Sequence, residues 1–213
     1  MLGYRSLVAL QIIKDDRVLK RVNKPETIRE LGTVDVADLE AAVARLSEKA
    51  WLREDSVKEN AFECFHSTRH FVLRFITGNA DPRVFTSYPA WQIWQPLMRP
   101  ILERATRDYG FAAPEYPKVM LARLEAGGVI DRHSDGAGSH PFTHKIHVPL
   151  QTNDQAHLEV GGNPYHLRKG TAYEVNNIKL HSAENRGKED RIHLIFEVFD
   201  TAQAGASIAS EAA

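Results

Sequence analysis

The chain has 213 residues, 43% hydrophobic and 26% charged, which is the composition of a globular protein with a substantial core. Its 27 Lys and Arg residues against 28 Asp and Glu give a net charge of -1, so the overall charge indicates neither a nucleic-acid nor an anionic-membrane partner. The single cysteine, Cys64, excludes an internal disulfide. The first residues show no signal pattern and no apolar run is long enough to span a membrane, so we expect a cytoplasmic protein.

The first half of the chain predicts a mixture of helices and strands. Residues 6–22 hold an apolar run, a polar turn and a second apolar pair, which indicates a hairpin. Asp35 is typical of an N-cap, and it precedes a helix of about four turns with apolar residues at helical spacing: Val36, Leu39, Val43, Leu46 and Ala50. Residues 71–76 are the clearest strand. A second helix is expected over residues 89–109, where two internal prolines predict a kink or two shorter pieces.

The second half predicts short strands separated by turn residues, at 119–124, 142–150, 157–160, 165–167, 171–175, 179–183 and 191–199. Such a series is typical of a jelly roll or a similar barrel. We therefore expect a mainly β protein with flanking helices. It would form a single domain over residues 1–200, with a helix-containing N-terminal region (residues 1–115) and a jelly-roll core (residues 116–200). Residues 201–213, rich in Ala and Ser, are expected to form a flexible tail.

One motif in the second half has metal-ligand chemistry. His133-Ser134-Asp135 places an imidazole and a carboxylate on one side of an extended backbone, because side chains alternate along a strand. His181 follows after four predicted strands, enough for the chain to cross the barrel and return beside its starting point. Two histidines and one carboxylate, with the opposite positions open, are the ligand set of non-haem Fe(II) oxygenases. The sequence therefore predicts His133, Asp135 and His181 as the metal ligands of a catalytic centre.

A second motif of the same kind, His157-Leu158-Glu159, competes with the first. Only two predicted strands separate it from His181, and it has the pattern of a hairpin arm, so the first motif is favoured. His140 and His144 are interpreted as loop and strand residues, because His181 already completes a facial ligand set.

Arg191 lies ten residues after His181, at the start of a long apolar strand. A fixed guanidinium beside a metal can hold a carboxylate through two parallel hydrogen bonds. The combination predicts a co-substrate that both chelates iron and carries a carboxylate. We expect Arg191 to lie on the antiparallel partner of the His181 strand.

The region from Val119 to Asp200 resembles the aspartyl/asparaginyl β-hydroxylase family of 2-oxoglutarate- and Fe(II)-dependent dioxygenases, which includes free-proline hydroxylases. The motifs that carry the resemblance are Arg132-His133-Ser134-Asp135, His144-Lys145-Ile146-His147-Val148-Pro149-Leu150, His181-Ser182-Ala183-Glu184-Asn185 and Arg191-Ile192-His193-Leu194-Ile195-Phe196. A looser similarity covers residues 66–75.

The resemblance implies a double-stranded β-helix and a hydroxylase that uses Fe(II), 2-oxoglutarate and O₂. By position in the motifs, His133, Asp135 and His181 would bind iron, Arg191 would pair with the distal carboxylate of 2-oxoglutarate, and His147 would also contact it. The aspartyl hydroxylases that name the family lack the metal-binding carboxylate. The presence of Asp135 is therefore closer to the small bacterial, proline-hydroxylase-like members.

For the prime substrate, the family implies an amino acid, free or within a peptide. Arg123, Arg132 and Lys145 are the cations predicted to hold its carboxylate, and Arg69 or His70 could approach from the upstream strand. The alternative is a cupin-type metal-dependent enzyme without redox chemistry, or a ligand-binding or sensor module. Cupin-type proteins have no need for an arginine ten residues after the last ligand, so Arg191 discriminates against them. A degenerate binding or sensor domain that has lost turnover is rejected only by an assay.

Overall fold

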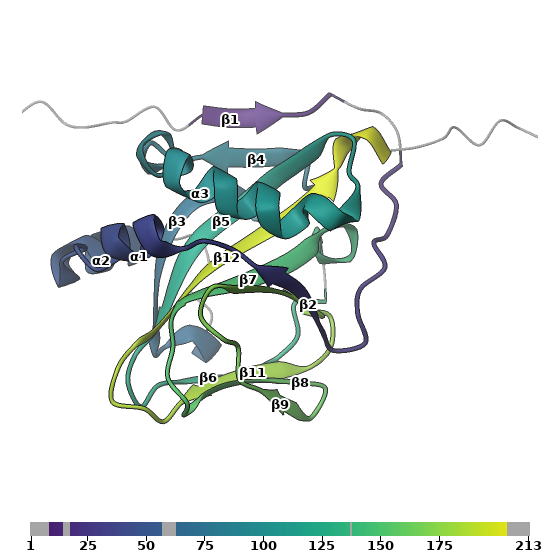
Figure 1. Cartoon of the computed structure of the whole chain (residues 1–213). Helices are drawn as coiled ribbons and strands as arrows, with labels where there is room; N and C mark the ends of the chain where they lie inside the picture. The colour runs from purple at the N-terminus through teal and green to yellow at the C-terminus, as the bar shows by residue number, and fades with distance from the viewer. Residues whose placement is uncertain (1–8, 15–17, 57–62, 137, 204–213) are drawn as a thin grey trace, which may run out of the picture.

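The computed structural model describes residues 9–14, 18–56, 63–136 and 138–203, which form two antiparallel sheets with helices on one side (Figure 1). The eight-stranded sheet has the order β1 (Ala9–Ile12), β4 (Val84–Ser87), β3 (Thr68–Ile76), β5 (Pro114–Leu124), β12 (Arg191–Asp200), β7 (His144–Gln151), β10 (Thr171–Val175) and β2 (Ile28–Thr33). The four-stranded sheet has the order β6 (Val129–His133), β11 (His181–Asn185), β8 (Ala156–Val160) and β9 (Asn163–Tyr165). This is the jelly roll predicted from the sequence.

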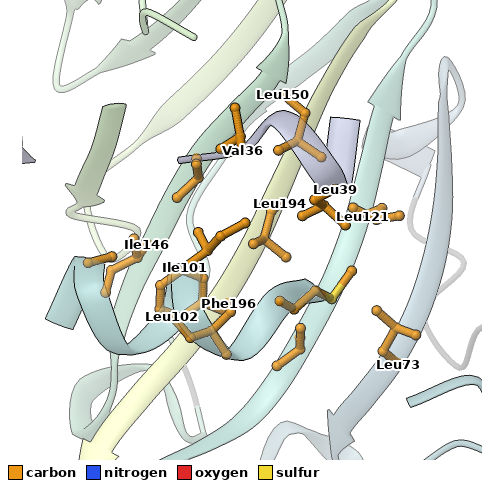
Figure 2. Close-up of a cluster of buried hydrophobic side chains, with 14 of the residues drawn as sticks. Val36, Leu39, Leu73, Ile101, Leu102, Leu121, Ile146, Leu150, Leu194 and Phe196 are labelled. Atoms are coloured by element: carbon orange, nitrogen blue, oxygen red, sulfur yellow. The ribbon is translucent and has the colours of Figure 1, made fainter. Parts of the chain in front are cut away.

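The central strands of the large sheet divide their side chains between two environments. Every second residue of β7 and β12 points to the helices α1 (Ala37–Val43) and α3 (Ala90–Thr106). They build the main core shown in Figure 2, which includes Leu39, Ile101, Leu102, Ile146, Leu150, Leu194 and Phe196. The alternate residues face the small sheet, because neighbouring side chains of a strand lie on opposite faces. These are the polar residues Lys145, His147, Arg191 and His193.

A second apolar cluster joins the two sheets. It contains Leu124, Tyr173 and Val175 from the large sheet and Leu158, Val160 and Ala183 from the small one. All six are nearly inaccessible to solvent. The cluster therefore fixes the small sheet against the large one and positions the ends of β6 and β11 opposite Arg191.

The N-terminal half differs in detail from what its sequence predicts. Residues 9–12 pair with β4 rather than with residues 18–22, and residues 15–17 of the predicted turn lie outside the described residues. The single helix expected after Asp35 is two helices, α1 and α2 (Glu48–Asp55), because Ser47 accepts a hydrogen bond from the backbone N–H of Ala50 and caps the second.

The helix with two internal prolines, α3, is one continuous element. Pro96 and Pro100 are four residues apart and both lie on its exposed face, where water can bond to the carbonyl groups that lose a backbone donor. The buried face, with Met98, Ile101 and Leu102, keeps its packing. Among the helices in the described residues, none is long and apolar enough to cross a membrane.

The strands β2, β4 and β6 were not predicted, and one predicted pairing was wrong. The His181 strand, β11, pairs with β6 and β8, whereas the Arg191 strand, β12, pairs with β5 and β7. His181 and Arg191 therefore belong to opposite sheets. Of the expected tail, residues 201–203 form a short 3₁₀ turn and residues 204–213 lie outside the described residues.

Candidate active site

The three predicted metal ligands meet at one end of the small sheet. His133 ends β6 and His181 begins β11, and antiparallel pairing sets them opposite each other with ring centroids 4.2 Å apart. Oδ1 of Asp135, two residues beyond β6, lies 3.7 Å from Nε2 of His133. One ligand atom from each residue lies within 4.8 Å of the others, and no second group of this kind occurs in the described residues.

A β-bulge in β6 aims His133 into the site. Ala183 pairs with Ile130 and His181 pairs with His133, so β6 has one residue more than β11 between these two positions. The extra residue reverses the alternation, and His133 therefore faces the interior like Ile130, while Arg132 is exposed.

Both histidines keep one ring nitrogen free for a metal. Nδ1 of His133 lies 2.7 Å from the carbonyl oxygen of Asp131, and Nδ1 of His181 lies 2.9 Å from that of Lys179. A carbonyl oxygen only accepts hydrogen bonds, so each Nδ1 carries the hydrogen and each Nε2 keeps its lone pair. Burial, together with the charge of Lys145, lowers the pKa of His181 to about 4, so its ring is neutral at pH 7. This donor set fits a divalent metal ion.

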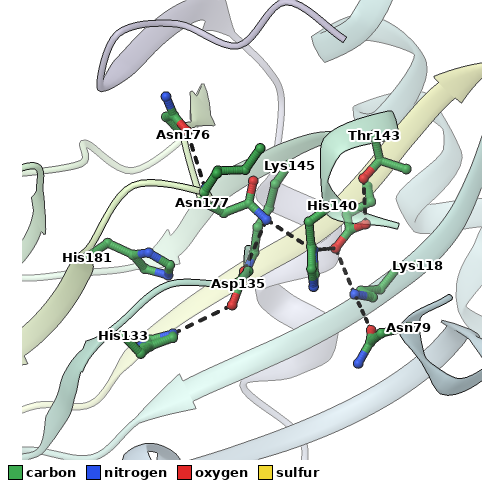
Figure 3. A network of polar contacts seen from close by, with 12 residues as sticks. Asn79, Lys118, His133, Asp135, His140, Thr143, Lys145, Asn176, Asn177 and His181 are labelled. Atoms are coloured by element: carbon green, nitrogen blue, oxygen red, sulfur yellow. Dashed lines mark hydrogen bonds and ion pairs between the residues drawn. The ribbon is translucent and has the colours of Figure 1, made fainter. Parts of the chain in front are cut away.

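Asp135 is held in place by the loop between β10 and β11 and by β7 (Figure 3). Its backbone N–H donates to the carbonyl oxygen of Asn177 at 2.9 Å. Its Oδ2 accepts from Nδ2 of Asn177 at 3.1 Å and from Nζ of Lys145 at 2.5 Å. Burial alone would raise the pKa of Asp135, but the nearby charge of Lys145 holds it well below its usual range. The carboxylate is therefore ionised and ready to bind a cation.

Arg191 lies in a cavity of about 80 Å³ that is also bordered by His133, His147 and His181. Its side chain is 3% exposed, and no carboxylate of the described residues lies within ion-pair distance of the guanidinium. Burial lowers the pKa of Arg191 to about 10, which leaves it protonated at neutral pH. A buried cation without a partner is unfavourable, so this cavity favours an anionic ligand.

His147 has a buried neighbour that sequence reasoning missed. Nδ1 of His147 and Nδ1 of His193 are 3.5 Å apart, and burial lowers the pKa of both rings well below the usual range. Neither Nε2 has a hydrogen-bond partner among the described residues. Alternation along β12 could have identified His193, because it lies two residues after Arg191 on the same face.

The cations predicted to hold a substrate carboxylate are placed differently. Arg123 also borders the small cavity, but both its terminal nitrogens lie 2.7 Å from carboxylate oxygens of Glu48. Arg132 is exposed and pairs with Glu159, and in the upstream strand Arg69 lies 3.3 Å from Glu125. His70 pairs with Asp55 at 3.5 Å. Lys145 is the predicted cation that reaches the metal ligands.

A larger cavity of about 730 Å³ adjoins the same ligands. Its walls come from β3, β5 and β12 and from the segments that follow β3 and β6, and they are largely apolar, with Val72, Phe75, Met120 and Ile195. His133 and Lys145 border both cavities. The site thus combines a small basic cavity and a large apolar one around a single set of metal ligands.

Comparison with known proteins gives a family and a fold. The model of the family described as Aspartyl/Asparaginyl beta-hydroxylase matches residues 98–201. The structure of EvdMO1 superposes with a TM-score of 0.51 at 14% identity, covering 82% of this chain and 47% of the other, which shows a shared fold. A search of curated protein sequences found no match.

Two further solved structures are similar at lower scores. The viral collagen prolyl hydroxylase vCPH from Paramecium Bursaria Chlorella virus-1, in its 2-oxoglutarate complex, has a TM-score of 0.48 at 12% identity, covering 81% of this chain and 96% of its own. HygX from Streptomyces hygroscopicus, with nickel, 2-oxoglutarate and hygromycin B bound, has a TM-score of 0.48 at 13% identity, covering 78% of each chain.

The family match contains the whole candidate site. It begins inside α3 and extends past the end of β12, so it includes the three metal ligands, His147 and Arg191. The resemblance drawn from the sequence motifs is thereby confirmed. Over this region, just under half of the chain, the protein is similar to the aspartyl/asparaginyl β-hydroxylase family of 2-oxoglutarate- and Fe(II)-dependent oxygenases.

Proposed function

We propose that this protein is a dioxygenase that hydroxylates an amino acid, free or as a residue of a peptide. The observation that carries the proposal is the buried guanidinium of Arg191, which has no ion-pair partner among the described residues and lies in the cavity that His133 and His181 also border. Fe(II) with 2-oxoglutarate and O₂ supplies the oxidant: one oxygen atom goes to a substrate C–H bond, the other to succinate, and CO₂ is released.

The residues of the small cavity would bind and orient 2-oxoglutarate. Arg191 would donate two hydrogen bonds to its distal carboxylate, and burial strengthens such charge-assisted bonds because little water competes. His147, a neutral ring with an unpartnered Nε2, would add a contact to the same molecule. A cupin-type site that binds no co-substrate with a carboxylate group would leave the buried charge of Arg191 without a partner. We therefore favour the oxygenase.

The large cavity would hold the prime substrate. Its volume, 730 Å³ against 80 Å³, is far greater than that of the small cavity, and it includes His133 and Asp135 in its wall. Of the three predicted substrate cations, Lys145 borders this cavity, and Asp135 occupies one of the three donors of its ammonium group. We therefore assign recognition of the substrate carboxylate to Lys145 rather than to Arg123 or Arg132. A cytoplasmic location stays a prediction from the sequence.

The proposal is tested without knowledge of the substrate. Metal-free protein is titrated anaerobically with Fe(II) and then with 2-oxoglutarate, and the visible metal-to-ligand charge-transfer band of the chelate is recorded. We expect the band in the parent protein, a weaker one in Asp135→Ala and Arg191→Ala, and an unchanged one in Arg132→Ala, which alters only an exposed ion pair. Folded, iron-loaded protein without the band would overturn the proposal. Succinate release with free amino acids and with peptides then separates the two substrate forms.

A further inference from the structure

We propose that Asn177 and Lys145 are positioning residues that hold Asp135 as a one-oxygen metal ligand, with Oδ1 presented to the metal and Oδ2 withheld from it. The inference rests on the proposed metal site and assigns a function to two residues beside it. It explains how a carboxylate that could chelate with both oxygens is restricted to one.

The two oxygens of Asp135 have different surroundings. Oδ1 is turned to the histidines and lies 3.7 Å from Nε2 of His133. Oδ2 accepts hydrogen bonds from Lys145 at 2.5 Å and from Asn177 at 3.1 Å (Figure 3). An oxygen with two donors directed at it has little lone-pair density left for a cation, so the geometry leaves Oδ1 as the ligand atom.

The restriction matters for the reaction. An octahedral ion with two imidazoles and one carboxylate oxygen keeps three positions, enough for a bidentate co-substrate and O₂. A second oxygen from Asp135 would occupy one of these positions. Holding Oδ2 away from the ion therefore protects the position that one of the reactants needs.

Asn177 is suited to this role because it holds both ends of Asp135. Its carbonyl oxygen accepts the backbone N–H of Asp135 while its side-chain amide donates to Oδ2. The amide orientation follows from the carboxylate, because a reversed amide would place its oxygen against Oδ2 of Asp135, which only accepts hydrogen bonds. Oδ1 of Asn177 is buried without a hydrogen-bond partner among the described residues. An unsatisfied buried oxygen lowers the stability of the fold, so this amide has a role other than stabilisation.

Asn177 lies beside a buried polar network that includes His140 and Glu197. Behind Asn177, Nδ1 of His140 lies 3.4 Å from a carboxylate oxygen of Glu197, which is completely buried in β12. Lys118 and Thr143 each donate to Glu197 at 2.7 Å. Because Glu197 of β12 is held by Lys118 of β5 and by Thr143, His140 has a fixed position 3.1 Å from Nδ2 of Asn177.

The chain offers a matched control. Asn185 is as completely buried as Asn177, and its amide donates to the carbonyl oxygens of Leu124, Glu125 and Glu189, away from the metal ligands. Asn185→Ala should therefore lose stability without changing the metal site. This separates a positioning role from a general loss of packing.

The test measures binding of Co(II) to Asn177→Ala, Lys145→Met and Asn185→Ala by anaerobic calorimetry and visible absorption. We expect the first two to bind Co(II) roughly 10- to 100-fold more weakly than the parent. They should also show a shifted d–d band, because a second carboxylate oxygen would replace a water molecule bound to the ion. Asn185→Ala should melt at a lower temperature but keep the parent's affinity and spectrum.

The outcomes separate this inference from the proposed function. A parent protein that does not bind Co(II) would overturn both. A parent that binds it, with Asn177→Ala and Lys145→Met unchanged in affinity and spectrum, would overturn only the positioning role. Lys145→Met keeps the test decisive should Asn177→Ala fail to fold, because Lys145 lies on β7, away from the loop of Asn177, and its removal leaves the amide in place.

Discussion

The motifs His133-Ser134-Asp135 and His157-Leu158-Glu159 have the same pattern and lie in or beside the same small sheet, but they have different environments. Asp135 is largely buried and is oriented by Asn177 and Lys145. His157 is exposed, and Glu159 pairs with the exposed Arg132. The pattern alone therefore does not make a metal site in this fold.

The difference comes from the direction of the side chains. In β8, Ala156, Leu158 and Val160 point into the second core, so the histidine and glutamate between them must point outward. In β6 the bulge shifts the alternation by one residue and turns His133 inward. The same sequence pattern therefore gives a candidate metal site at the end of β6, where the bulge adds one residue, and a pair of outward-facing side chains in β8.

Replacing the carboxylate residue of each motif with alanine should give the largest difference in metal affinity between the two motifs. Asp135→Ala removes a metal ligand, so we expect Fe(II) affinity to fall by more than the roughly 10- to 100-fold typical of residues that only orient ligands. Glu159→Ala removes only a partly exposed ion pair, and metal affinity should stay within about twofold of the parent. Anaerobic calorimetry measures both. Equal losses in the two variants would contradict the assignment of the ligands.

The sequence was sufficient to identify the three residues that meet at the candidate metal site, and insufficient for those that depend on strand register. His181 was identified because the predicted strands bring the chain back to His133. Arg191 was identified from its residue type, although its pairing with the His181 strand was wrong. The bulge in β6 has no glycine or proline to indicate it, and the role of Asn177 depends on a contact across the barrel.

The missed strands have a similar physical reason. β2 has a mixed pattern, Ile28-Arg29-Glu30-Leu31-Gly32-Thr33, and obtains its extended form from pairing with β10 across a register shift. β4 has only four residues directly after a turn. Short strands depend on tertiary pairing more than on propensity, so a single sequence does not reveal them.

Removing the buried cation should separate function from stability. Arg191→Leu should weaken 2-oxoglutarate binding by roughly 10- to 100-fold, the loss of a charge-assisted pair of about 1.5–3 kcal/mol. Without ligand, the variant should melt at the same or a higher temperature, because an unpaired buried charge has been replaced by an apolar side chain. Titration of the charge-transfer band and calorimetric melting measure the two effects.

Arg132→Leu, beside the second motif, is the exposed counterpart and should change neither quantity. A sharp fall in the melting temperature of Arg191→Leu would instead show that the guanidinium is mainly a structural group.

The turns that follow the two motifs should respond differently to one added carbon. Gly138, after Asp135, has φ of +67°, and a Cβ there would lie 1.9 Å from the carbonyl oxygen of Asn79. Gly162, after the second motif, has φ of +85° but open space around the same position. Both alanine variants carry the backbone penalty of about 1 kcal/mol. Gly138→Ala should lose a further ~1–3 kcal/mol from the clash.

Urea unfolding measures the free energy of both glycine variants. Equal losses in Gly138→Ala and Gly162→Ala would show that the loop after Asp135 moves freely away from Asn79. That result would contradict a rigid approach to the metal ligand.

The smallest expected effect concerns pH and the buried histidines. Burial lowers the pKa of His147 and His193 well below 6.5, so the unfolded chain binds more protons than the folded one as the pH falls below that value. Each ring should therefore remove up to about 1.4 kcal/mol of stability per pH unit below 6.5 until its folded-state pKa is reached. His193→Leu should lose less stability than the parent between pH 7 and 5.5, by about 1 kcal/mol, in urea unfolding at each pH. His157→Leu removes an exposed ring and should keep the parent's slope. If His193→Leu also keeps that slope, the two rings between β7 and β12 accept protons in the folded protein, and the small cavity is less dry than its residues indicate.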